Sequence, residues 1–189
     1  MKLRKVTAAS AVVLALALSA TACGGDKKDN DSGSSGSGGG KIKIGIKFDQ
    51  PGLGLQKPDG TYAGFDVDVA TYVAKQLGYT PDKIEWVQTK SADRENALAR
   101  GDVKFIAATY SINDERKQKV DFAGPYLLAH QDLLIKSDST ISKGTDLNGK
   151  KLCSVTGSTS AQNVQKTIAP DAQLKEVSSY SECIAALQS

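Results

Sequence analysis

Residues 108–122, A-T-Y-S-I-N-D-E-R-K-Q-K-V-D-F, carry side chains that suit the binding of a small anion. A strand-like run ends here in small hydroxylated residues, and these are followed by acids and then by Arg116. The planar guanidinium of arginine suits a bidentate contact with a carboxylate better than a lysine does. Ser111 and Arg116 could therefore hold an anion at the end of a strand. The alternative is a solvated, charged helix, which fits Lys117 and Lys119 better than Arg116.

The sequence gives little support for catalysis or metal binding. The single histidine, His130, has no cysteine or serine–aspartate set that can be argued around it. Of the three cysteines, Cys153 and Cys183 are better used as a disulfide, and one histidine does not make a metal site. We expect Asp66 and Asp68 to cap a helix or line its exposed face rather than to form a catalytic dyad. The prediction is a protein without cofactor, metal or enzymatic activity.

Residues 1–22 are typical of an export signal. Lys2, Arg4 and Lys5 precede an apolar run over residues 8–18, which is too short to span a bilayer. The whole chain has 24 Lys and Arg against 21 Asp and Glu, and loss of these three residues leaves 21 against 21. The basic excess is therefore a targeting feature, and we expect no nucleic-acid partner.

The signal ends at a cysteine that is followed by a tether. Residues 20–23, A-T-A-C, resemble a bacterial lipobox, which predicts a lipidated Cys23 and a protein held at the outer face of the cell membrane. An ordinary secretory signal with a chance cysteine is the alternative. Residues 23–40, rich in Gly and Ser, predict a flexible linker because they contain nothing to bury.

Hydrophobic periodicity predicts an α/β body after the linker. Apolar and polar residues alternate over 41–47 as in a strand, residues 48–61 are punctuated by Gly and Pro as in a loop, and apolar residues recur at helical spacing over 64–77. Further strands are predicted over 83–88, 103–110, 152–155 and 174–177, and residues 120–136 are predicted to form an extended run. A short helix capped by Ser91 is predicted to end at Arg100. A second helix is predicted from the T-G-S-T-S-A turn to about Ile168, and a third over 180–187. This alternation favours sheets covered by helices.

The second α/β unit has only two predicted strands, and a two-stranded sheet rarely stands alone. We therefore expect the natural gene to continue past Ser189. Cys153 and Cys183 remain as an even pair, for which a disulfide is the default in an exported protein. Two buried free thiols are the alternative.

Three motifs in the body resemble one family. They are G-T-Y-A-G-F-D-V-D-V-A, S-A-D-R-E-N-A-L-A-R-G-D-V and S-I-N-D-E-R-K-Q-K-V-D-F-A-G-P-Y. In order and spacing they resemble the amino-acid-binding (extracellular solute-binding, family 3 type) proteins of bacterial ABC importers, over residues 41–189. The lipobox, the linker, K-F-D-Q-P-G-L-G and the cysteine spacing are most similar to glutamate-binding lipoproteins of actinobacteria.

The resemblance implies a two-lobed, periplasmic-binding-protein-like α/β clamp. Its first lobe, residues 41–130, would be nearly complete, residues 131–151 would form the crossover, and residues 152–189 would form a partial second lobe. Such a protein captures an amino acid in the interlobe cleft, here L-glutamate first and then aspartate or glutamine, and delivers it to a membrane permease and its ATPase. We expect a monomer.

The family pattern also implies a set of ligand-binding residues. Arg116 and Ser111 would hold the α-carboxylate, and Ala108 and Thr109 would face the ammonium group. Lys47 and Arg94, with Ser91 beside Arg94, would anchor a side-chain carboxylate. Thr159 and Ser160 would lie at a helix start in the second lobe. Phe48 and Tyr62 would pack against the aliphatic part of the ligand or, alternatively, take part in ordinary lobe packing. Helix N-termini favour carboxylates, which agrees with this placement.

Several expectations remain open. The family's acidic partner for the ligand ammonium would lie beyond Ser189, so residues 1–189 alone are expected to bind weakly or not at all. A cyclohexadienyl or arogenate dehydratase-like enzyme of the same fold, a ligand-binding sensor domain and a structural lipoprotein are the alternatives. The placement of Arg94 and Arg116 favours binding over a structural role.

Overall fold

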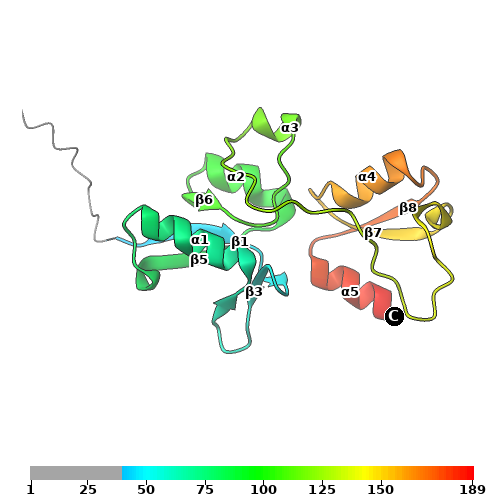
Figure 1. Ribbon diagram of the computed structural model, residues 1–189, viewed down its shortest axis with the longest axis horizontal. Helices are drawn as coiled ribbons and strands as arrows, with labels where there is room; N and C mark the ends of the chain where they lie inside the picture. Colours follow the sequence, from blue (N-terminus) through cyan, green and yellow to red (C-terminus); the bar gives the residue numbers. More distant parts are fainter. Residues whose placement is uncertain (1–39) are drawn as a thin grey trace, which may run out of the picture. The chain divides into compact units, whose positions relative to one another are not determined.

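The computed structural model describes residues 40–189. The predicted signal, Cys23 and nearly all of the linker lie outside the described residues. Within the described range, no helix has the length and apolar character needed to cross a membrane. Figure 1 shows the strands and helices along the chain, beginning with β1 in blue and ending with α5 in red.

The first unit is organised around a parallel sheet of order β5-β1-β6. The central strand β1, Ile42–Ile46, is buried, and it pairs with β5, Ile84–Gln88, and with β6, Phe105–Ile106. Parallel neighbours require crossover connections, which helices provide here. The short β6 corrects the strand predicted over 103–110. Its pairing ends after the amide of Ala107 bonds to Gly45, because the backbone turns at Thr109, where φ is 48°.

The predicted loop over 48–61 is wrong in part, since it contains two strands of a small antiparallel sheet of order β2-β3-β4. The strands of this sheet are Asp49–Gln50, Gly54–Gln56 and Tyr62–Ala63. Strands of two or three residues are too short for an alternating pattern to register. Gly64 follows them with φ 119°, and a Cβ at this position would collide with the Leu53 backbone.

Three helices belong to the first unit: α1, Phe65–Gln76; α2, Arg94–Ala99; and α3, Asp114–Lys117. The prediction that Ser91 caps α2 is wrong, because a 3₁₀ turn, Ser91–Asp93, precedes the helix and Ser91 makes no capping bond. The prediction for Asp66 is also wrong, since Asp66 is fully buried. Two further 3₁₀ turns are Pro81–Lys83 and Gly144–Leu147.

The second unit contains the parallel pair β7, Lys151–Val155, and β8, Gln173–Val177. Two helices accompany it: α4, Ser160–Thr167, and α5, Tyr180–Gln188. The predicted disulfide is confirmed: Cys153 of β7 bonds to Cys183 of α5, with Cα atoms 5.7 Å apart. It fastens α5 to the sheet.

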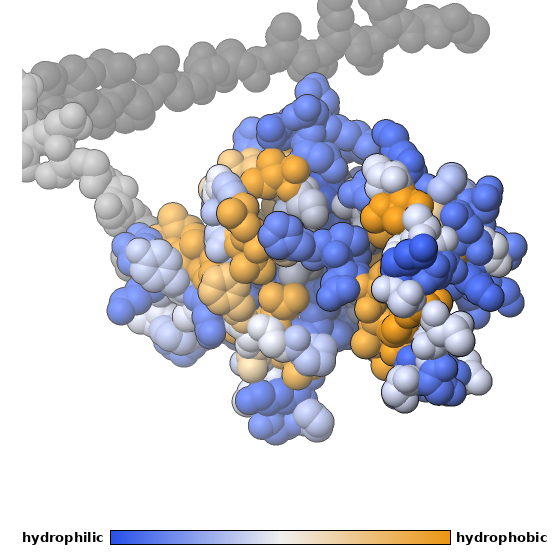
Figure 2. All heavy atoms as spheres, turned by 45° about the vertical axis from the view of Figure 1, so that its right-hand side comes forward, coloured by the Kyte–Doolittle hydropathy of each residue, from blue (hydrophilic) through white to orange (hydrophobic). Residues whose placement is uncertain are grey.

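Each unit has its own buried cluster. Ile42, Ile44, Ala70, Ala74 and Ala107 form the first, and Leu147, Val164, Ala169 and Ala172 form the second. Between the two clusters in sequence, residues 120–136 form neither a helix nor a strand. Leu128 and Leu134 of this segment are 82% and 69% exposed. On the face drawn in Figure 2, apolar side chains reach the surface among polar ones.

Candidate functional site

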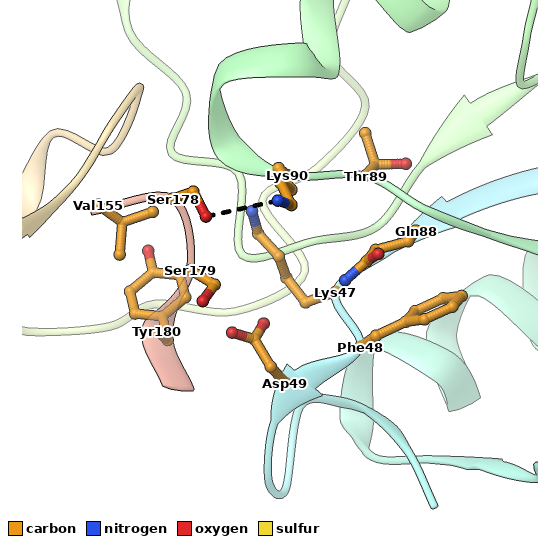
Figure 3. A pocket seen from close by; sticks show the side chains of 10 residues that line it. All are labelled: Lys47, Phe48, Asp49, Gln88, Thr89, Lys90, Val155, Ser178, Ser179 and Tyr180. Atoms are coloured by element: carbon orange, nitrogen blue, oxygen red, sulfur yellow. Dashed lines mark hydrogen bonds between the residues drawn. The ribbon is translucent and has the colours of Figure 1, made fainter. Parts of the chain in front are cut away.

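Lys47 is a buried cation at the end of β1. Its side chain is only 3% exposed, and Nζ donates to Ser91 Oγ at 2.8 Å. Ser91 is itself buried in the turn that leads into α2. On the other side, Nζ lies 5.8 Å from the ring centroid of Tyr180 at the start of α5. Figure 3 shows Lys47 and Tyr180 among the residues that line a small pocket.

Arg94, at the first position of α2, is the second buried cation. Its guanidinium donates from Nε to the Ser91 carbonyl at 3.2 Å and from Nη1 to the Ala108 carbonyl at 3.4 Å. Nη2 donates to the carbonyl of Gly157, which belongs to the second unit, at 3.0 Å. Arg94 therefore joins the ends of two strands of the first unit to the loop after β7.

Arg116 of α3 is the third buried cation. The side chain of Asn113 caps α3 by accepting the Arg116 amide at 2.8 Å, so the helix start fixes its backbone. Nη1 donates to the Ser111 carbonyl at 2.8 Å, and Nη2 donates to the Gly157 carbonyl at 3.0 Å. Nε lies 4.0 Å from Glu95 Oε1. Burial and these contacts contradict the alternative of a solvated helix residue.

Tyr110 and Glu95 support the arginines, and sequence reasoning missed both. The carbon centres of the Arg94 and Arg116 guanidinium groups lie 3.9 and 4.7 Å from the Tyr110 ring centroid, which is a favourable cation–π range. The Tyr110 hydroxyl donates to Glu95. An aromatic residue between Thr109 and Ser111, at the end of the third predicted strand, was the signal available in the sequence.

The electrostatics of the site are those of cations held out of water. Burial lowers the pKa of Lys47 to about 8, with Arg94 adding to the effect and Asp49 opposing it. Burial, together with Arg116, lowers the pKa of Arg94 to about 10. Burial and the hydrogen bond to Glu95 raise the pKa of Tyr110. Burial alone would raise the pKa of Glu95, but the bond from Tyr110 and the two arginines hold it below its usual value.

The other predicted residues differ in the groups through which they contact the arginines or their neighbours. Ala108 contributes its carbonyl to Arg94, and Ser111 contributes its carbonyl to Arg116, whereas no hydrogen bond of the Ser111 hydroxyl is found within the described part of the chain. The hydroxyl of Thr109 donates to Gln50 at 2.9 Å. The neighbouring Asp66 is buried, and burial raises its pKa, although Tyr126 donates to it at 2.7 Å.

The second unit meets Arg116 across an open groove of about 560 Å³. Thr159, at the start of α4, lines this groove together with Gly157, Glu95 and Arg116. Ser160 is exposed and does not line the groove, so the structure does not bring it to the cations. A groove with this lining could admit a small anionic molecule to Arg116.

The two aromatic candidates differ in their surroundings. Tyr62 packs between Phe48 and Trp86, with ring centroids 5.1 and 5.9 Å away, which is packing within the first unit. Phe48 also lines the small pocket that contains Lys47. The structure therefore places Phe48, but not Tyr62, at this pocket.

Comparison with known proteins finds relatives that are named as amino-acid-binding proteins. The chain is 50% identical over 152 residues to the glutamate-binding protein GluB of Corynebacterium efficiens, covering 77% of this chain and 51% of the relative. It is 39% identical over 147 residues to the glutamine-binding protein of Geobacillus stearothermophilus, with coverages of 77% and 56%. The chain thus spans about half the length of these curated relatives.

The solved structures agree on the fold. An ancestral amino-acid-binding protein described as a precursor of cyclohexadienyl dehydratase is similar with a TM-score of 0.71 and 31% sequence identity. The match covers 79% of this chain and 66% of that one. The similarity includes both α/β units, so the fold is the two-lobed one predicted.

Two α/β lobes with buried cations where they meet define a clamp-type binding protein. The chain belongs to the bacterial extracellular solute-binding proteins, family 3, whose model matches residues 42–189.

Proposed function

We propose that the complete protein captures an acidic amino acid between its two lobes and delivers it to an ABC permease and its ATPase. L-Glutamate is the first candidate, followed by aspartate and glutamine. Arg116 and Ser111 hold the α-carboxylate, and Ala108 and Thr109 face the ammonium group. Lys47 and Arg94, with Ser91 between them, receive the side-chain carboxylate. Thr159, which lines the groove beside Arg116, contributes from the second lobe.

The convergence of Lys47, Arg94 and Arg116 carries this proposal. All three are buried, and their hydrogen bonds go to carbonyl and hydroxyl oxygens. Within residues 40–189, the one carboxylate within 4.0 Å of their nitrogens is that of Glu95, beside Arg116. A buried charge is costly unless it is paired, so a site with this cationic excess favours a ligand with two carboxylates over a neutral one.

The relatives support the same substrate class. They include a glutamate-binding and a glutamine-binding protein, at 50% and 39% identity. An extracellular solute-binding family is consistent with export, for which we propose cleavage of residues 1–22 and a lipid anchor at Cys23. We propose a monomer that needs no cofactor and binds no nucleic acid. The lobe boundaries 41–130, 131–151 and 152–189 belong to the same proposal.

Isothermal calorimetry on the protein expressed from its complete gene tests the function. We expect glutamate to bind more tightly than glutamine, and aspartate to lie between them or near glutamate. Tighter binding of glutamine or another neutral amino acid would contradict the role of the second pair of cations. Turnover of prephenate or arogenate by the same preparation would replace the transport proposal with the dehydratase alternative.

A further inference from the structure

A carboxylate of the first unit bonds to a helix of the second. Asp49 of β2 accepts two hydrogen bonds at Oδ2 from Ser181 of α5, from the backbone amide at 3.0 Å and from Oγ at 3.3 Å. The two residues are 132 positions apart in the sequence. This contact lies outside the three-cation cluster described above and has no counterpart in the sequence patterns.

The position of Ser181 explains why a carboxylate is favourable there. Helix α5 begins at Tyr180, and the hydroxyl of Ser179 caps it by accepting the amide of Glu182 at 3.3 Å. The amide of Ser181 is another first-turn donor that has no acceptor within the helix. Asp49 supplies that acceptor, and its negative charge complements the positive end of the helix dipole. The first unit thus contributes a second cap to a helix of the other unit.

The same helix start carries Tyr180, the ring of which lies 5.8 Å from Lys47 Nζ. Figure 3 shows the Asp49 side chain directed toward the start of α5, next to Lys47 and Tyr180. A displaced helix start would move Tyr180 away from the lysine. Asp49 also acts on Lys47 through its charge. Burial, Arg94 and Arg116 lower the pKa of Lys47, whereas the negative charges of Asp49 and Asp93 raise it.

The disulfide links this contact to the rest of the second unit. Cys183, two residues after Ser181, is bonded to Cys153 on β7. Helix α5 therefore cannot move far without its sheet. Holding its first turn holds the position of the second unit on the first at this point.

We infer that Asp49 is a positioning residue that caps α5 across the two units and keeps Tyr180 and the second unit over the ammonium group of Lys47. The contact stands on the geometry alone. Its part in ligand capture rests on the proposed function, in which Lys47 receives a carboxylate.

Hydrogen–deuterium exchange read by mass spectrometry tests the contact without any ligand. In Asp49→Ala, we expect the amides in the first turn of α5 to exchange about three- to tenfold faster, as loss of a hydrogen bond of ordinary strength implies. Asp49→Glu, which keeps the carboxylate, should recover part of the protection. Asp59→Ala is the matched control, because Asp59 lies in the loop of the same small sheet and, among residues 40–189, its side chain bonds only to Thr61.

A second measurement separates positioning from mere packing. The rate at which an amine-acylating reagent labels Lys47 should rise in Asp49→Ala. Asp49→Asn keeps the shape of the side chain but not its charge, so the pH midpoint of Lys47 labelling should fall below that of the wild type. Peptides from β1 serve as the internal check on folding, since general unfolding would accelerate their exchange too. If α5 exchange and the Lys47 midpoint are both unchanged in the variants, the inference is overturned. Failure of glutamate binding alone would overturn the proposed function and leave this contact in place.

Discussion

Arg94 and Arg116 donate to the same oxygen atom, the carbonyl of Gly157, each from Nη2 and each at 3.0 Å. Two guanidinium groups from different helices thus converge on one acceptor of the second unit, while both lie against Tyr110. An oxygen held in this way occupies a position that suits a carboxylate oxygen, because arginine bonds carboxylates through paired, charge-assisted contacts.

The close approach of Gly157 leads to the first prediction. Its φ is +78°, and a Cβ would lie 2.7 Å from the backbone of Ala92. Gly157→Ala should therefore destabilise the protein through both the left-handed conformation and the collision, and should expose the two arginines. Gly149→Ala is the control, since Gly149 has φ +73° with open space around it and adds only the conformational strain, about 1 kcal/mol. Denaturant unfolding and the rate of arginine labelling by phenylglyoxal measure the two effects. Equal behaviour of the two variants would contradict the close contact.

Arg116 should be the largest single contributor to affinity in the complete protein. Its removal leaves a ligand carboxylate desolvated and unpaired, so Arg116→Ala should cost roughly 2–5 kcal/mol of binding free energy, or about thirty- to several-thousand-fold in Kd. Calorimetry with glutamate measures the loss. Arg100→Ala is the control, because Arg100 is exposed just beyond α2 and pairs only with Asp102 within the described chain. A loss of less than threefold at Arg116 would remove it from the site.

The cations could be predicted from sequence because family spacing and residue type both point to them. Lys47, Arg94 and Arg116 are indeed buried together. The partners that hold them could not be predicted. The carbonyl of Gly157 carries no side-chain signal, and Glu95 resembles any acid on a short helix. The Asp49–Ser181 bond joins positions that only the folded chain brings together.

The fold, like the site, was predictable from sequence only in part. Long periodic segments were predicted closely, as for the helix expected over 64–77 and found as Phe65–Gln76. The short strands β2, β3 and β4 were missed because two or three residues establish no period. The strand over 103–110 was predicted too long, because its apolar composition continues past Ile106 while the backbone turns at Thr109.

Arg94 should distinguish glutamate from glutamine. In the proposed site it faces the side-chain carboxylate, which glutamine lacks, so Arg94→Ala should weaken glutamate binding much more than glutamine binding. Parallel calorimetric titrations with both ligands give the comparison. Equal losses for the two ligands would show that Arg94 supports the main-chain groups or the fold instead.

The pKa of Lys47 predicts opposite effects of pH on binding and stability. Because it is about 8 in the folded chain, against an ordinary value of 10.5, glutamate affinity should fall as pH rises through about 8. Between these two values the unfolded lysine keeps its proton while the folded one has lost it, so this group's contribution to stability rises with pH. The gain should be of the order of 1–3 kcal/mol.

Lys47→Met is the control for both trends, since it cannot titrate. The variant should lose the component of the pH dependence centred near 8 in calorimetry and in denaturant unfolding. Above pH 8, wild-type binding should take up protons, which titrations in buffers of different ionisation enthalpy detect. Wild-type affinity that is constant between pH 7 and pH 9 would contradict a charged Lys47 in the site.

The disulfide should matter most for the second unit. Cys153 and Cys183 are 30 positions apart, and a closed loop of this length stabilises the folded chain by roughly 3–4 kcal/mol in the chain-entropy model. The double variant Cys153→Ser, Cys183→Ser should unfold at a lower denaturant concentration, and its α5 amides should exchange faster than those of β1. Reductant should reproduce the effect in the wild type and change nothing in the double variant. Identical unfolding of the oxidised and reduced wild type would mean that the packing of α5 on β7, rather than the covalent bond, holds the helix in place.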